Sequence, residues 1–73
     1  MKTRMEDGFL IMTTAFDERL WEQLDLDEAE MYSITDPHPI LVEIWERGYS
    51  PIDAEKRGDK IVIWAIPDSA RRK

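Results

Sequence analysis

The chain contains no cysteine and only three glycines among its 73 residues. Without cysteine it can form neither a disulfide nor a thiolate metal site, so stability must come from packing or from a partner chain. Three glycines are too few for the glycine-rich loops that hold nucleotide phosphates. The longest apolar run, Ile61 to Ile66, is far shorter than the about 20 residues of a membrane-spanning helix. No secretory leader is visible either, so we expect a cytoplasmic protein that does not contact the membrane.

The residue sets that usually carry catalysis are incomplete. His38 is the only histidine, and one imidazole without a cysteine can build neither a metal site nor a nucleophile pair. The carboxylates from Asp25 to Glu30 alternate as in a calcium loop but lack its glycine and its closing bidentate acid. The tripeptide Arg57-Gly58-Asp59 matches an integrin-binding motif, but a tight turn explains it fully. We therefore predict a protein that is not an enzyme and uses no cofactor, metal or small-molecule substrate.

Charge is abundant and unevenly distributed. Residues 17–46 hold ten acids and one base, a net charge of -9, whereas residues 47–73 hold seven bases and four acids, a net charge of +3. A strongly acidic surface steers onto a basic patch of another protein. Carboxylates spaced along a helix can also imitate a phosphate backbone. The overall charge of -6 disfavours direct nucleic-acid binding, except through the basic C-terminal end within a larger complex.

The N-terminal part of the chain predicts a strand followed by a helix. Gly8 to Thr14 is rich in β-formers and apolar on both faces, which indicates a strand. Apolar residues recur at helical spacing from Phe16 to Leu24, so this segment predicts a helix with one buried stripe. The hydroxyl of Thr13 or Thr14 could cap its first free amides.

The middle of the chain is partly ambiguous. Residues 25–33 predict either a short second helix, capped by Asp25 or Asp27, or an acidic loop. The following helix is better defined. Pro39 suits its first position because a missing N–H costs nothing there, and Gly48 suits its end because glycine readily takes the left-handed conformation.

The C-terminal part predicts a hairpin. Its strands are Ile52 to Lys56 and Lys60 to Ile66, and Gly58 supplies the positive φ of the tight turn between them. The second strand is apolar on both faces, which is typical of a central, covered strand. We expect it to pair with the first strand of the hairpin on one side and with Gly8 to Thr14 on the other.

These elements predict an α+β fold: a small single domain over residues 1–73, in which a three-stranded antiparallel sheet packs against two or three short helices. Its core spans about residues 8–67, and residues 68–73 form a flexible basic tail. Three residues of the central strand should be among the most buried: Ile61, Ile63 and Trp64.

The candidate partner-binding residues are of three kinds. The first kind is the carboxylates of the acidic segment, which steer association. The second is two aromatic side chains next to predicted interruptions of the secondary structure, and the third is the cations of the tail. Aromatic side chains are included because they dominate binding hot spots. The candidates are Glu22, Asp25, Asp27, Glu28, Glu30, Tyr32, Tyr49, Arg71, Arg72 and Lys73.

The stretch ILVEIWERGYSPIDAEKRGDKIVIWAI, from Ile40 to Ile66, resembles the helix-hairpin unit of the small N-terminal docking domains of peptide-synthetase modules. In that family a leucine-rich helix ends in Arg-Gly, and two strands joined by a glycine-containing turn follow. Arg47-Gly48 and Arg57-Gly58-Asp59 occupy those positions here. The resemblance implies a protein-docking function.

The chain as a whole is small, acidic and without catalytic motifs, and it resembles the transcription regulators of Xanthomonas phages that bind host RNA polymerase. The resemblance implies a viral, non-enzymatic inhibitor of host transcription initiation that also promotes read-through of terminators (antitermination) in the bacterial cytoplasm. It transfers no site residues. Two alternatives are retained: an acidic nucleic-acid mimic that inhibits a bacterial defence nuclease, of anti-restriction or anti-CRISPR type, and a protein docking domain.

Overall fold

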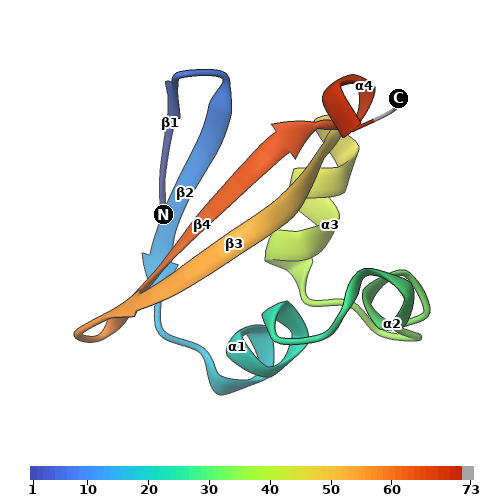
Figure 1. Ribbon diagram of the computed structural model, residues 1–73. Coiled ribbons are helices and arrows are strands. Elements are labelled where there is room, and N and C mark those ends of the chain that lie inside the picture. The colour runs from blue at the N-terminus through green and yellow to red at the C-terminus, as the bar shows by residue number, and fades with distance from the viewer. Residues whose placement is uncertain (72–73) are drawn as a thin grey trace.

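The computed structural model describes residues 1–71, which form a four-stranded antiparallel sheet and four helices (Figure 1). The strands are β1 (Lys2–Glu6), β2 (Phe9–Ala15), β3 (Tyr49–Arg57) and β4 (Lys60–Pro67). The helices are α1 (Glu18–Leu24), α2 (Glu28–Tyr32), α3 (Pro39–Glu46) and α4 (Asp68–Arg71). The strand order is β1-β2-β4-β3, so β1 and β3 are the edges of the sheet.

The α+β class is confirmed, but the prediction of a three-stranded sheet with two or three helices is wrong. The fourth strand is β1, which pairs with β2 from Lys2 opposite Thr13 to Glu6 opposite Phe9. All five residues of β1 are exposed, and none of its faces is apolar enough to produce the alternation that indicates a strand. The fourth helix is α4, which has only four residues.

The turn between β1 and β2 explains how this exposed strand is held in place. It consists of Asp7 and Gly8, whose φ angles are 53° and 84°. Two residues with positive φ are what a type I′ hairpin turn requires, and this turn matches the twist of the flanking strands. The pairing of β1 is therefore specified by the turn and by the backbone ladder rather than by burial.

Strand β4 is an interior strand with the two neighbours that were predicted, but in the four-stranded sheet it shares the centre with β2. It pairs with β2 on one side, where Met12 lies opposite Ile63, and with β3 on the other. The tight turn of the hairpin has Gly58 at φ 59°, also as predicted. Strand β3 is longer than expected, and its register shifts at a bulge between Pro51 and Asp53.

The core lies on one face of the sheet, between the strands and helices α1 and α3. Ile61 and Ile63 are completely buried there, which confirms their prediction. Trp64 is only half-buried, so its prediction is wrong: alternate residues of a strand point to opposite faces, and Trp64 points away from the helices. The buried cluster consists of Leu10, Met12, Leu20, Leu41, Ile44, Ile61, Ile63 and Ala65.

The first two helices are capped by aspartates. Asp17, not Thr13 or Thr14, caps α1: its Oδ1 accepts the Leu20 N–H at 3.1 Å. Both threonines belong to β2, which runs further than predicted because Ala15 still pairs with β4. Asp27 caps α2 by accepting the N–H of Glu30, so residues 25–33 contain a helix rather than an acidic loop alone.

The third helix begins and ends as predicted. Pro39 occupies its first turn, and Gly48 follows its C-cap Arg47 with φ 82°. Its N-cap is His38, whose Nδ1 accepts the N–H of Ile40 at 3.1 Å. No helix within residues 1–71 is long and apolar enough to cross a membrane.

The C-terminal segment starts with a docked residue. The N–H of Asp68 donates to the carbonyl oxygen of Gly48 at 2.8 Å, and its Oδ1 accepts a hydrogen bond from the hydroxyl of Ser50. Helix α4 follows directly. Residues 72–73 of the predicted tail lie outside the described residues, and the flexibility of residues 68–73 stays a prediction.

Candidate partner-binding groove

A groove of about 390 Å³ lies between helices α1 and α2 and strand β3. Its apolar lining comes from Trp21 and Leu24 of α1, Leu26 of the linker, Met31 of α2, and Ile52 of β3. We call it the edge groove because it runs along the free edge of the sheet. Asp25, Tyr32 and Asp53 also line it, so polar and charged groups border an apolar interior.

The β3 side of the groove is shaped by the bulge. Ile52 lies within the register shift, and 49% of its surface is exposed. Pro51 has no N–H, and Oδ1 of Asp53 accepts the N–H of Ala54 at 2.9 Å. A proline and a bulge hinder the addition of a further strand at this edge. The groove is therefore suited to contacts with side chains rather than to extension of the sheet.

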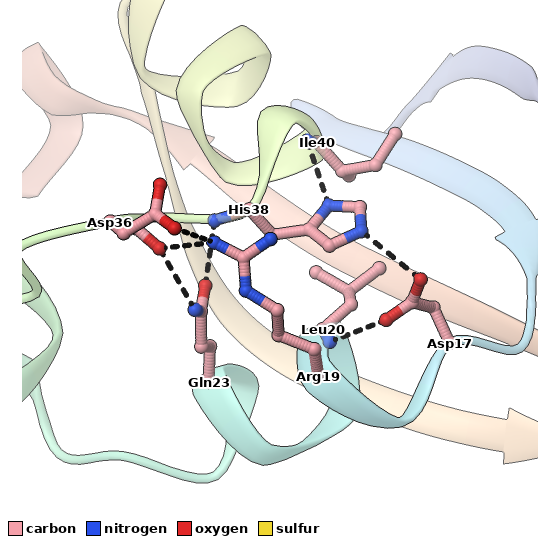
Figure 2. A network of polar contacts seen from close by, with 7 residues as sticks. All are labelled: Asp17, Arg19, Leu20, Gln23, Asp36, His38 and Ile40. Atoms are coloured by element: carbon pink, nitrogen blue, oxygen red, sulfur yellow. Dashed lines mark hydrogen bonds and ion pairs between the residues drawn. The ribbon is translucent and has the colours of Figure 1, made fainter.

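The α1 wall is held in place by a polar network, shown in Figure 2. The guanidinium of Arg19 lies 2.9 Å from the carboxylate of Asp36, and Gln23 donates to the Asp36 carbonyl oxygen at 3.2 Å. The Oε1 atom of Gln23 accepts the N–H of His38 at 2.7 Å. Two consecutive turns of α1 are thus tied to the segment that leads into α3.

The same network includes Asp17 and His38, the N-caps of α1 and α3. Nε2 of His38 lies 3.5 Å from Oδ2 of Asp17. Because Nδ1 of His38 accepts a backbone N–H, the ring proton of the neutral form is on Nε2 and points to Asp17. The N–H of Leu20, and to a lesser extent the His38 side chain, hold the pKa of Asp17 below its usual value. The network thus fixes the orientation of α1, whose residues line the groove.

Tyr32 is held on the opposite wall while half of it faces solvent. Its hydroxyl is 2.8 Å from the hydroxyl of Ser50, and its ring centroid is 5.7 Å from that of Trp45. Its exposed fraction is 52%. A tyrosine that is fixed in this way offers contact area to a partner at little cost in conformational entropy.

The separation of charge along the sequence is also a separation in space. Residues 17–46, with their net charge of -9, form α1, α2 and α3, which all lie on one side of the sheet (Figure 1). Of the bases, Lys2, Arg4, Lys56, Arg57 and Lys60 lie on strands. The edge groove is therefore on the acidic side of the molecule.

The structure brings part of the predicted site together. Asp25 and Tyr32 line the groove. Glu22 and Glu30 are exposed on α1 and α2, which form its wall, and Asp27 is exposed at the N-cap of α2. The side chains of Glu28 and Arg71, together with Arg72 and Lys73, lie outside what the structure describes.

Tyr49 lies elsewhere. It is half-buried against the core, and its hydroxyl donates to the Sδ atom of Met5 at 3.9 Å. The predicted pair of aromatic anchors is therefore divided: one lines the groove and the other packs against the core.

Sequence reasoning missed the apolar residues of the groove. Leu26 follows the end of α1, outside the helical stripe, and Ile52 is turned outward by a bulge that depends on pairing with β4. Met31 is buried on a helix of five residues, too short for a clear periodicity. The one local signal was Pro51, which commonly marks an edge strand.

Within residues 1–71, no group of three or more potential metal-ligating side chains converges on one point. Comparison with known proteins returned no match: no family model, curated protein or solved structure is significantly similar to this chain.

Proposed function

We propose that this protein is a non-enzymatic, phage-encoded regulator that binds host RNA polymerase through the edge groove and its acidic surroundings. On binding, it inhibits transcription initiation and promotes read-through of terminators. The observation that carries the protein-binding part is the combination of an apolar groove with carboxylates at its border, on the face with the highest negative charge.

The two components of this surface have different roles. Burial of apolar side chains supplies most of the affinity of a protein interface, and a few central residues dominate it. Long-range attraction between opposite charges mainly raises the association rate. A matching partner segment therefore carries apolar side chains that enter the groove and lysines or arginines around them.

RNA polymerase offers suitable basic surfaces because it must hold a nucleic-acid backbone. Its choice as the partner rests on the resemblance to the Xanthomonas phage regulators. The charge of the helical side is consistent with that choice.

A nucleic-acid mimic that inhibits a defence nuclease is the alternative, and the acidic helices favour it. A mimic of the phosphate backbone acts mainly through its carboxylates. The apolar lining of the groove has no role in such a mechanism. A substitution that removes apolar contacts without changing the charge should therefore distinguish the two proposals, because it weakens binding only if the groove is used.

The test measures binding to purified Xanthomonas RNA polymerase by biolayer interferometry between 50 and 300 mM salt. Asp25→Lys/Glu30→Lys should slow association, and the difference from the wild type should shrink as salt rises. Glu46→Lys/Asp59→Lys is the matched control, because it makes the same change in net charge at exposed positions outside the groove. Ile52→Ala should accelerate dissociation at unchanged charge, and its exposed position makes a large effect on folding unexpected.

Equal effects of the groove and control reversals would contradict a localised site. An unchanged dissociation rate for Ile52→Ala, with a strong effect of charge, would support mimicry. If the protein does not bind RNA polymerase, the polymerase is not its partner. A docking domain would instead bind an isolated peptide of its partner.

A further inference from the structure

The face of the sheet that points away from the helices is apolar along its centre. Within residues 1–71, helices α1 and α3 pack on the opposite face, and α2 lies beside them near the β3 edge (Figure 1). On an antiparallel sheet with one solvated face, the outward positions are normally polar. Here the outward positions of the central strands β2 and β4 include five apolar residues. They are Phe9, Ile11, Val62, Trp64 and Ile66, and none belongs to the core cluster. Ile11 and Val62 expose only 3% and 6% of their surfaces, so the accessible apolar area comes mainly from the half-buried Phe9, Trp64 and Ile66.

The edge strands add opposite charges to this outer face. In one row across the sheet, Lys2 of β1 is aligned through Thr13 and Val62 with Glu55 of β3. In the next row, Arg4 is aligned through Ile11 and Trp64 with Asp53. Each of these two rows thus has a cation at the β1 edge and a carboxylate at the β3 edge. In the flanking rows the signs are reversed: Glu6 of β1 lies 3.7 Å from Arg4, and Arg57 of β3 lies 2.7 Å from Glu55.

We propose that this outer face is an interface between two copies of the chain. A two-fold axis parallel to the strands, lying between two stacked sheets, places β1 of each copy over β3 of the other in the same row. Lys2 then faces Glu55 of the second copy, and Arg4 faces Asp53 of the second copy. The interface is isologous, so each contact occurs twice.

The charges also fix the orientation. A two-fold axis perpendicular to the strands would stack β1 on β1 and β3 on β3, so charges of the same edge would meet. Only the axis parallel to the strands pairs opposite charges in both rows while it stacks the apolar centres. Aligned packing of this kind is the usual geometry of two face-to-face sheets.

The size of the face predicts a weak, reversible dimer. Four strands about 4.8 Å apart and six to seven residues long present roughly 400 Å² per copy. The total for two copies, roughly 800 Å², is below the lower limit of specific interfaces, about 1,000 Å². A dissociation constant of roughly 10–100 µM is therefore expected. The shortest dimension of one copy is 17 Å, which fits one sheet and one helical layer, so the dimer has four layers.

The proposal is tested by sedimentation velocity between 5 and 500 µM. Lys2→Glu alone brings glutamates together at both symmetry-related contacts, and Glu55→Lys alone brings lysines together. Each variant should dimerise about tenfold more weakly. An equimolar mixture of the two variants should recover wild-type affinity, because both contacts of the heterodimer are then opposite in sign. A chain that carries both Lys2→Glu and Glu55→Lys should also dimerise with wild-type affinity.

Glu46→Lys on α3 is the control and should leave the dissociation constant unchanged. Circular dichroism checks folding, because Glu55 forms an exposed ion pair with Arg57 at 2.7 Å within its own chain. Damage to folding cannot explain a dimer affinity that recovers when the two variants are mixed. The test therefore remains valid even though Glu55→Lys also removes the ion pair with Arg57.

A monomer at every concentration would overturn the proposal. So would a dimer that resists both single reversals, or a mixture that fails to recover. Binding of a single-stranded oligonucleotide by a wild-type monomer, abolished by Arg4→Glu, would assign the outer face to nucleic acid and likewise overturn the dimer.

Discussion

Nε2 of His38 lies 3.5 Å from Oδ2 of Asp17, so the residue that caps α3 contacts the residue that caps α1 (Figure 2). Each side chain uses one polar atom for its own helix and the other for its partner. The contact joins the starts of two helices, although the two capping residues are 21 positions apart in the sequence. It therefore helps to set the position of α1, which lines the edge groove.

Replacement of His38 separates its two roles. His38→Ala removes both the cap of α3 and the contact with Asp17, and it should lower the free energy of unfolding by about 1–2 kcal/mol. His38→Asn keeps a capping acceptor and should lose less than half of that amount. Urea denaturation at pH 7 measures both values. Equal losses would show that the capping bond is not what His38 contributes.

Asp17 should make the protein sensitive to acid. Its pKa is lowered in the folded state, mainly because its carboxylate accepts the N–H of Leu20. The stabilisation is therefore present above the unfolded pKa, about 3.9, and is lost as the pH falls through the lower folded value. Asp17→Asn keeps the capping acceptor but cannot titrate, so its Tm should fall less than that of the wild type between pH 5 and 2.

The control for this experiment is Glu18→Gln, which removes one negative charge from the same turn. Its Tm should follow the wild-type profile more closely than that of Asp17→Asn does. Parallel Tm profiles for the wild type and Asp17→Asn would contradict the role assigned to Asp17.

Two neighbours on β4 should differ in their importance for stability. Ile63 is completely buried in the core, and Ile63→Ala should cost roughly 2–5 kcal/mol. Trp64 is half-buried on the outer face, with the Arg57 guanidinium 5.7 Å from its ring centroid. Trp64→Ala should therefore cost less, about 1–2 kcal/mol. Denaturation at low micromolar concentration, where the monomer predominates, gives the comparison; a larger cost at Trp64 would contradict the assignment of faces.

The parts of the fold that were predicted correctly have strong local signals. Gly58 marks the hairpin turn, Pro39 and Gly48 delimit α3, and the apolar run of β4 identifies the centre of the sheet. At the glycines and the proline, one residue type is preferred for a backbone reason that does not depend on distant contacts. In β4 the signal is the continuous apolar run. The sequence therefore predicted the positions of these elements and their order in the sheet.

The parts that were missed depend on long-range pairing. Thr14 and Asp17 both satisfy the rule for an N-cap, and what decides between them is that β2 continues to Ala15 opposite β4. Strand β1 has no apolar face, and the one local signal for its pairing with β2 is the Asp7-Gly8 turn, which the prediction did not use. The groove depends on the β3 bulge, for which Pro51 is the one local signal.

The central claim is that the edge groove contacts RNA polymerase, and hydrogen–deuterium exchange of the complex tests it most directly. Binding should slow exchange in peptides that cover residues 24–32 and 52–54, because these peptides contain most of the residues that line the groove. Residues 9–15 belong to β2 and should exchange at the rate of the free protein at the same low concentration. Protection confined to β2, or no change along residues 24–32 and 52–54 in a saturated complex, would contradict the account.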